Sequence, residues 1–283
     1  MKPSFSFELF PPKTEKGMDK LKTTVAELNA LGPEYFSVTY GAGGSTRERT
    51  FAVVEWLCSQ GIETAPHLSC IGADRDEIEA ILQSYIELGI RRIVALRGDL
   101  PSGAGAGEPG EFNYANELVA FIHERFPGRF QVEVAAYPEF HPQAPDARTD
   151  LRNFKRKVEA GAQGAITQYF YNADAYRHFL GDCRLLGIEI PIVPGIMPIT
   201  NYTNLARFSD ACGAEIPRWL RKRLETLEND PRALFDFGVE VVTELCRQLI
   251  DLGAPSLHFY TMNQAAAPKA ICANLGLGGA PAA

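Results

Sequence analysis

A chain of 283 residues has room for one large domain or two average ones, and single α/β barrels reach this length. Its 46% hydrophobic and 22% charged residues are ordinary values for a globular protein and exclude a disordered chain. The 28 basic and 35 acidic residues leave a formal net charge of -7. This balance disfavours nucleic acid and anionic membranes as partners, because both are bound through basic patches.

The cysteines and the N-terminus bear on the compartment. None of the six cysteines forms a C-x-x-C pair, which argues against a zinc ribbon or a redox motif and favours reduced thiols. An acidic residue, Glu8, comes before any hydrophobic region of signal-peptide length, and no apolar run is long enough to span a membrane. We therefore expect a soluble, cytoplasmic protein.

Short apolar, β-branched or aromatic runs alternate along the chain with segments of helical period, such as Leu21, Val25 and Leu28. Asp74 with Glu77, and Ser45 with Glu48, have the spacing of capping boxes at helix starts. The predicted strands are Ser4–Phe7, Tyr35–Val38, Thr64–Leu68, Arg92–Leu96, Gln131–Ala135, Ala165–Thr167, Ile190–Val193 and Ser256–Phe259.

Eight strand–helix alternations predict an α/β fold in which a parallel sheet closes into a (β/α)₈ TIM barrel. The long last interval has room for an extra helix, around Pro217–Asn229, before the last strand. No linker divides the chain, so we expect a single domain over residues 1–276 and a disordered tail over 277–283. The Gly/Pro-rich stretch Pro101–Gly110 is predicted to be a loop within the barrel.

Polar residues follow most of the predicted strands. Because the βα loops of a barrel gather at the carboxyl ends of its strands, these groups should converge on one mouth and suit a polar small-molecule ligand. They are Glu8, Thr39, Tyr40, His67, Arg97, Asp99, Tyr137, Gln168 and the segment His258–Asn263.

The residues alone leave individual roles open. The apolar context of Glu8 would raise the pKa of its carboxyl toward use as a general acid, although a solvent-facing strand end is an equal alternative. Asp99 either serves the site or pairs with Arg97 in a turn, and Gln168 either serves the site or fills the barrel wall. No histidine has metal-binding spacing, so we expect no metal.

Asp150, Asn153 and Lys157 form one stripe of a predicted helix that also carries Arg156. Such a stripe is usually a solvated face, and the alternative is a site for a phosphate-bearing ligand. Gly105–Gly110 matches the pattern G-x-G-x-x-G, but it follows no strand directly, so it is not a dinucleotide fingerprint.

Nine motifs, in order over nearly the whole chain, resemble bacterial methylenetetrahydrofolate reductase, and a shared barrel fold alone does not explain such an order. The motifs are F-E-L-F-P-P (7–12), S-V-T-Y-G-A-G-G (37–44), A-P-H-L-S-C (65–70), A-L-R-G-D (95–99), A-A-Y-P-E-F-H-P (135–142), N-F-K-R-K-V-E-A-G-A (153–162), I-T-Q-Y-F (166–170), P-G-I-M-P (194–198) and H-F-Y-T-M-N (258–263).

The resemblance implies a barrel that holds FAD non-covalently and uses NADH or NADPH, with NADH favoured, to reduce 5,10-methylenetetrahydrofolate to 5-methyltetrahydrofolate. The two substrates would take turns at the flavin in a ping-pong scheme, and the product would supply methyl groups for methionine synthesis. Bacterial members form homo-oligomers, so a homo-oligomer is expected here. Inhibition by S-adenosylmethionine is not expected, because the chain has no regulatory domain after the barrel.

Roles carry over residue by residue from the same resemblance. Glu8 resembles the general acid that protonates the anilinic nitrogen of the folate ring, and Asp99 an acidic residue near both flavin and pterin, so these two are the implied catalytic residues. The implied FAD contacts are Tyr40, Ala42, His67, Arg97, Gly98, Asp99, Ala115, Tyr137, His141, Ala144, Asp150, Asn153, Arg156 and Lys157. The implied substrate contacts are Thr39, Asp99, Gln168, Asn204, Phe208 and Gln264.

Two positions depart from the family pattern, since Asn204 replaces a Gln and Gln264 replaces an Arg. Loss of the Arg predicts weaker binding of the folate tail. Two alternatives are a pterin-binding methyltransferase barrel without flavin and a non-catalytic barrel that serves as a binding subunit. The 150–157 stripe argues against the first alternative, and Glu8 argues against the second.

Overall fold

The computed structural model describes residues 3–40, 44–98 and 110–278. Its strands are β1 (Ser4–Leu9), β2 (Phe36–Val38), β3 (Thr64–Ser69), β4 (Arg92–Leu96), β5 (Gln131–Ala136), β6 (Gly164–Thr167), β7 (Ile192–Val193), β8 (Gly195–Ile196) and β9 (Ser256–Tyr260). Its helices are α1 (Glu15–Asn29), α2 (Gly44–Ser59), α3 (Arg75–Glu87), α4 (Ala115–Arg125), α5 (Ala147–Glu159), α6 (Ala173–Leu185), α7 (Tyr202–Cys212), α8 (Arg218–Leu227), α9 (Pro231–Asp251) and α10 (Ala266–Asn274).

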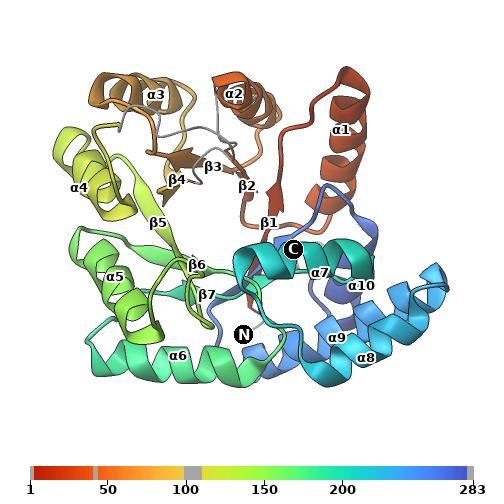
Figure 1. Ribbon diagram of the computed structural model, residues 1–283. Coiled ribbons are helices and arrows are strands. Elements are labelled where there is room, and N and C mark those ends of the chain that lie inside the picture. The colour runs from red at the N-terminus through yellow and green to blue at the C-terminus, as the bar shows by residue number, and fades with distance from the viewer. Residues whose placement is uncertain (1–2, 41–43, 99–109, 279–283) are drawn as a thin grey trace.

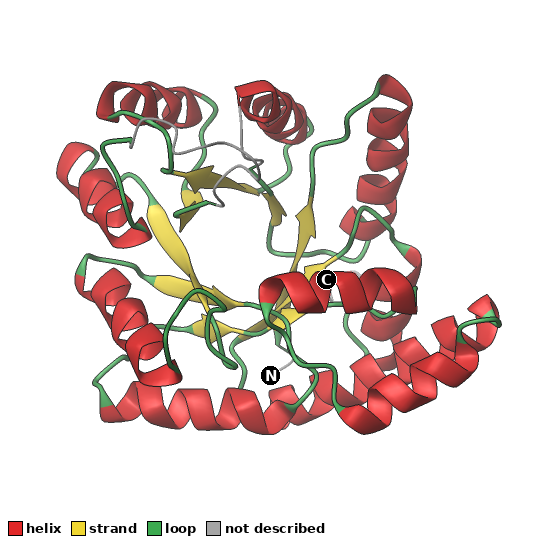
Figure 2. Ribbon diagram, viewed as in Figure 1, coloured by secondary structure: helices red, strands yellow, loops and turns green. Residues whose placement is uncertain are grey.

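The predicted (β/α)₈ barrel is confirmed. The strands pair in the order β7-β6-β5-β4-β3-β2-β1-β9-β8, every pair is parallel, and the helices surround them (Figures 1 and 2). The seventh barrel strand is divided at Pro194, which lacks an N–H and interrupts the ladder. Its first half, β7, pairs with β6, and its second half, β8, pairs with β9. The carbonyl of Pro194 accepts a hydrogen bond from the backbone N–H of His258 at 3.1 Å, so the two halves together close the barrel.

Alternation along β1 separates the two faces of the barrel wall. Phe5, Phe7 and Leu9 are buried on one face, and the Phe7 ring lies 5.7 Å from Phe36 and 5.8 Å from Phe259. Successive side chains of a strand point to opposite faces, so Ser6 and Glu8 project into the barrel interior. Burying a phenylalanine in the outer layer contributes roughly 1.5–3 kcal/mol, which fixes the register and therefore the inward side chains.

Local signals at helix ends agree with the prediction. Asp74 caps α3, and its side chain accepts from the backbone N–H of Glu77 in a full capping box. The side chain of Ser45 lies outside the described part of the structure. Gly161, one of the glycines that follow a helix, has φ +115, a conformation that favours glycine.

The extra helix predicted around Pro217–Asn229 is α8, and a further helix, α7, precedes it. The hydroxyls of Tyr169 and Ser209 on α7 are 3.0 Å apart, and the backbone N–H of Glu215 donates to the Glu139 carboxylate at 2.8 Å. These contacts place α7 over the loops that follow β5 and β6, and Figure 1 shows it crossing one end of the barrel. Beyond α10, Leu277 is 4% exposed, whereas residues 279–283 of the predicted tail and 101–109 of the predicted loop lie outside the described residues.

Candidate active site

The carboxylate of Glu8 lies between two imidazoles at the carboxyl end of the barrel strands. Its Oε2 is 3.4 Å from Nε2 of His67 on β3 and 3.6 Å from Nε2 of His258 on β9. The Glu8 side chain is 17% exposed, compared with 10% for His67 and 0% for His258. Among the described residues, no hydrogen bond reaches the Glu8 carboxylate. The site therefore presents a half-buried carboxylate whose oxygens are left open to a ligand by the described residues.

His258 is fixed by its neighbours. Its Nδ1 is 2.7 Å from the hydroxyl of Ser6, its Nε2 is 3.3 Å from the hydroxyl of Ser37, and the Tyr35 ring stacks on it at 6.0 Å. The predicted site includes His258 only as a strand-end polar residue without a role. The signal for a larger role is the alternation S-L-H-F-Y along β9, which puts His258 on the inward face.

His67 has an orphaned nitrogen. Its buried Nε2 makes no hydrogen bond among the described residues, and Glu8 approaches it to 3.4 Å without hydrogen-bond geometry. Burial lowers the pKa of the His67 imidazole, and the Glu8 carboxylate opposes that shift. At neutral pH, His67 is therefore a neutral group directed at Glu8.

Tyr260 packs beside His258. Its hydroxyl donates to the Thr167 carbonyl at 2.7 Å, and its ring meets that of His258 edge to face at 5.5 Å. Burial raises the pKa of Tyr260 well above its usual value, so the phenol stays neutral. A Cβ at Gly195 would lie 2.6 Å from the Tyr260 ring, so the glycine makes room for this tyrosine.

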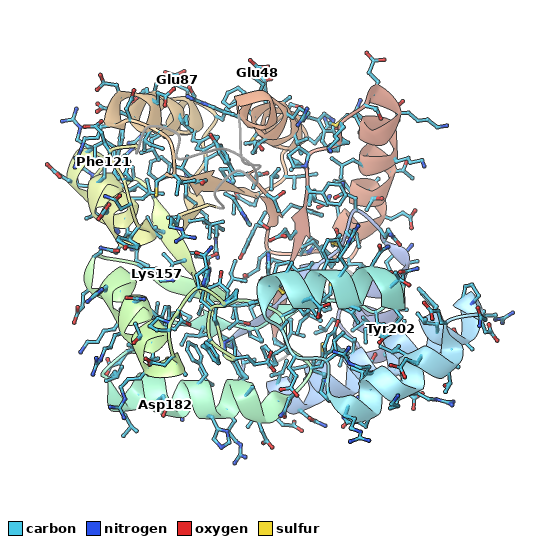
Figure 3. All side chains as sticks on the ribbon, viewed as in Figure 1. Glu48, Glu87, Phe121, Lys157, Asp182 and Tyr202 are labelled. Atoms are coloured by element: carbon cyan, nitrogen blue, oxygen red, sulfur yellow. The ribbon has the colours of Figure 1, made fainter. Side chains whose placement is uncertain are left out.

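Lys157 and Asp150 turn from α5 toward the barrel. The Lys157 Nζ donates to the Ala135 carbonyl at 2.5 Å, and Figure 3 shows this side chain on α5 beside the strands. Burial lowers the pKa of Lys157 to about 8, with Asp150 opposing the shift. Burial raises the pKa of Asp150, while a hydrogen bond from the His141 N–H at 3.1 Å lowers it. The ring of Tyr137 lies 4.7 Å from that of His141.

The predicted α5 stripe divides into two parts. Whereas Lys157 and Asp150 are half-buried, Asn153 and Arg156 are exposed, and the Arg156 guanidinium donates to the Asn153 amide at 3.1 Å. The exposed pair matches the solvated-face interpretation, and the buried cation is the part that stands out as a candidate anion contact.

Arg97 and Gly98 follow β4. The Arg97 guanidinium donates to the Gln143 side chain at 2.5 Å, in the loop before α5. Gly98 has φ +88, and a Cβ there would lie 1.8 Å from the Ser69 hydroxyl, so only glycine fits. Asp99, for which the sequence allows either a role in the site or a pair with Arg97, lies outside the described residues, and so does Ala42.

The other predicted contacts lie around the same mouth. Thr39 donates its N–H to the Leu9 carbonyl at 2.9 Å, and the Gln168 amide oxygen accepts from the Tyr169 N–H at 3.0 Å. Tyr40 is half-buried, and burial raises its pKa. Ala115 begins α4, and the Ala144 N–H donates to the His141 carbonyl at 2.9 Å in the turn before α5.

The predicted folate contacts are less enclosed. Asn204 and Phe208 lie on α7, where Asn204 is exposed and Phe208 is half-buried, 5.2 Å from the Arg207 guanidinium. Gln264 is exposed just after β9. Within the described residues, no hydrogen bond joins these three to Glu8. A cavity of about 340 Å³, lined by Tyr176, Arg184 and Pro255 among others, lies at the opposite, amino-terminal end of the strands and contains none of the predicted residues.

No helix among the described residues is long and apolar enough to cross a membrane. The fold and the mouth define a class: a (β/α)₈ barrel enzyme whose strand ends present a carboxylate, imidazoles, amides and half-buried cations to a polar small molecule. The family model for methylenetetrahydrofolate reductase matches residues 1–276. The chain belongs to the methylenetetrahydrofolate reductase family, as the nine motifs predict.

Curated relatives agree with this assignment. The chain is 42% identical over 273 residues to the 5,10-methylenetetrahydrofolate reductase of Salmonella typhimurium, covering 96% of this chain and 90% of the relative. It is 41% identical to the Escherichia coli protein of the same name, over the same shares of each chain. It is 38% identical to methylenetetrahydrofolate reductase (NADH) 1 of Arabidopsis thaliana, covering 97% of this chain and 48% of that longer protein.

A solved structure shares the fold. An uncharacterised Clostridium thermocellum protein that binds two copies of 5-methyl-5,6,7,8-tetrahydrofolic acid superposes with a TM-score of 0.66 at 17% identity, covering 97% of this chain and 94% of that one. At this identity the likeness supports the barrel fold alone.

Proposed function

We propose that this chain catalyses the reduction of 5,10-methylenetetrahydrofolate to 5-methyltetrahydrofolate, with a reduced nicotinamide as electron donor and non-covalently bound FAD. The observation that carries the proposal is the Glu8 carboxylate, half-buried between His67 and His258 and without a hydrogen bond among the described residues. A barrel that only binds a ligand has no need of such a proton donor. The assignment to a reductase family supports the same conclusion.

The residues around α5 and β4 fit a dinucleotide with a pyrophosphate. Lys157 and Arg97 supply cations beside each other's loops, at the carboxyl ends of β5 and β4. The buried Lys157 gains most from an anion, because a nearby phosphate would favour its charged form. These two cations, with Tyr40, His67, Gly98, Tyr137, His141, Asp150, Asn153 and Arg156, would hold FAD, and we retain Ala42, Asp99, Ala115 and Ala144 as further contacts.

FAD, when bound, would carry the hydride equivalent from the nicotinamide to the folate. The protein's part is the proton. Glu8 Oε2 would protonate the anilinic nitrogen of the folate ring, and His67 and His258 would hold the carboxylate in place. Asp99 would be the second catalytic residue, close to the pterin.

The remaining substrate contacts have distinct parts. Gln168 would hydrogen-bond the pterin edge, Phe208 would pack against whichever substrate is bound, and Thr39 would contact the reductant. Asn204 and Gln264 would contact the folate, and because both are exposed, they would meet its solvent-facing part.

The family assignment also supports proposals on the electron donor, the kinetic order, the location and the oligomeric state. We propose NADH as the favoured donor, in line with the names of the plant relatives, and a ping-pong order in which the oxidised nicotinamide leaves before the folate binds. The protein would work in the cytoplasm as a homo-oligomer and supply methyl groups for methionine synthesis. Residues 1–276 would form the catalytic domain.

Product analysis tests the function. Purified protein, with and without added FAD, is incubated anaerobically with methylenetetrahydrofolate and either NADH or NADPH, and folates are separated by chromatography. We expect 5-methyltetrahydrofolate only with FAD, and more of it with NADH. Absence of product with both donors in FAD-loaded protein would contradict the proposal, as would product formation that is independent of flavin.

A further inference from the structure

The segment after β9 has an unusual backbone. Met262 and Asn263 have φ 51 and 53, two consecutive left-handed residues of which neither is glycine. Asparagine tolerates this conformation better than most residues, but a pair of such residues persists only where its surroundings hold it. The contacts of Asn263 identify those surroundings.

Asn263 binds both backbone groups of Phe10, two residues beyond Glu8. Its amide oxygen accepts from the Phe10 N–H at 3.0 Å, and its NH₂ donates to the Phe10 carbonyl at 2.8 Å. The β1–β9 ladder ends with Glu8 opposite Tyr260. The left-handed turn carries the backbone after β9 out of the sheet. Phe10 therefore pairs with the Asn263 side chain, where a continued β9 would have offered backbone groups.

The backbone from Glu8 to Phe10 is held at each carbonyl. The Thr261 hydroxyl donates to the Glu8 carbonyl at 2.6 Å, and the Thr39 N–H donates to the Leu9 carbonyl at 2.9 Å. The two prolines that follow Phe10 restrict it to an extended conformation. Asn263 itself is tied to α1, since the Thr24 hydroxyl donates to its carbonyl at 3.2 Å.

We propose that Asn263 is a positioning residue for Glu8. By pairing with Phe10 in two directions it fixes the end of β1, so the Glu8 carboxylate stays between His67 and His258 and in line with the folate nitrogen. The inference rests on the proposed role of Glu8 as proton donor. Only asparagine combines tolerance of a left-handed backbone with a short amide that donates and accepts. Glycine would tolerate the left-handed backbone but has no side chain to bind Phe10. Aspartate would lose the NH₂ group that donates to the Phe10 carbonyl.

The test separates the two half-reactions in FAD-loaded protein. Asn263→Gly keeps the backbone conformation and removes both bonds to Phe10, and Asn263→Asp removes only the donor. Asn274→Ala, which removes an amide 3.4 Å from the Thr243 hydroxyl at the end of α10, is the matched control. Stopped-flow absorbance follows reduction by NADH and reoxidation by methylenetetrahydrofolate. Steady-state assays give kcat and KM.

We expect Asn263→Gly to slow reoxidation by about tenfold or more, because small misplacements of a reacting group are amplified in rate. Reduction by NADH and the KM for folate should stay within about twofold, and Asn274→Ala should match the unsubstituted protein. Asn263→Asp should show the same pattern, and it replaces Asn263→Gly as the test if the glycine variant does not fold.

Unchanged reoxidation, or equal loss in both half-reactions, would overturn the positioning role. Glu8→Gln, measured alongside, distinguishes this failure from failure of the proposed function. If Glu8→Gln abolishes reoxidation while Asn263→Gly does not, only the positioning role is wrong. If Glu8→Gln reoxidises normally, the role of Glu8 itself is wrong.

Discussion

The barrel contains two inward-facing carboxylates with opposite surroundings. Glu133 on β5, near the amino-terminal end, is 4% exposed and accepts from Arg92 at 2.7 Å and from the Tyr35 hydroxyl at 3.1 Å. The Arg92 guanidinium also lies 4.3 Å from the centre of the Tyr35 ring. Glu8, near the other end, is 17% exposed, and its neighbours among the described residues are imidazole nitrogens at 3.4 and 3.6 Å.

The comparison indicates that the amino-terminal end of the barrel contributes stability and that the carboxyl-terminal end carries the chemistry. The Glu133 carboxylate has an arginine on one oxygen and a tyrosine on the other, so the fold itself supplies its partners. No described residue forms a hydrogen bond to the Glu8 carboxylate, so its oxygens are open to a substrate. This follows the division of barrel enzymes into a stabilising amino-terminal face and a reactive carboxyl-terminal face.

The largest expected effect separates the two carboxylates. Glu8→Gln should slow flavin reoxidation by methylenetetrahydrofolate by about 10²–10⁴-fold, because the proton donor is lost, and should leave reduction by NADH nearly unchanged. Glu133→Gln is the matched substitution at the other end and should leave both rates alone. Stopped-flow absorbance measures both steps. Equal loss of both steps in Glu8→Gln would refute the role assigned to Glu8. Slow reoxidation in Glu133→Gln would show that the two carboxylates do not differ in their effect on the reaction.

Stability should respond in the opposite way. Arg92→Met leaves the buried Glu133 carboxylate without its cation and should lower the free energy of unfolding by about 3 kcal/mol. Arg125 pairs with Glu79 at 2.7 Å with both side chains exposed, so Arg125→Met should lower it much less, because solvent screens an exposed ion pair. Urea titration gives both values. Similar losses in the two variants would show that the Arg92 pair contributes no more than a surface pair.

A smaller effect concerns FAD. Lys157→Met should weaken FAD binding at pH 7 by about tenfold, the contribution of one charge-assisted hydrogen bond. Because the pKa of Lys157 in the FAD-free protein is lowered to about 8, its charge is present below that pH and is lost above it. Affinity in the unsubstituted protein should therefore fall between pH 7 and 9, and the variant should lack that slope. FAD fluorescence titration measures both.

The control for this prediction is on the same helix. The Lys155 side chain is 40% exposed and its Nζ lies 3.6 Å from the Glu159 carboxylate, so Lys155→Met should change neither the affinity nor its pH dependence. If Lys155→Met weakened FAD as much as Lys157→Met does, general surface charge would explain the result, and the buried lysine would have no special part.

The smallest expected effect is on the KM for folate, at the exposed residue Gln264. Gln264→Arg should lower the KM for methylenetetrahydrofolate by about threefold, since an exposed ion pair contributes only about 0.2–1 kcal/mol. Its kcat should not change, because the site of proton transfer is untouched. An unchanged KM in steady-state assays would mean that position 264 does not meet the charged tail of the folate.

Alternation and strand ends predict the barrel, its eight strand positions and the convergence of Glu8 and His67 on one mouth. They miss the division of the seventh strand at Pro194, which depends on how the barrel closes. The sequence pattern also assigns no role to His258 and does not single out Glu133. A polar residue in a strand can be recognised as inward-facing only when helices are known to cover the other face of the sheet. The Asn263 contact joins residues 253 positions apart, and no local pattern encodes it.

We propose that electrons pass from a nicotinamide to a folate through FAD bound at one end of the barrel. An anaerobic visible absorption titration is the most direct test. NADH is added to the FAD-loaded protein, followed by methylenetetrahydrofolate. We expect the flavin bands to bleach with the first addition and to return with the second. Protein that fails to take up FAD, or flavin that bleaches and is not reoxidised by the folate, would contradict the proposal.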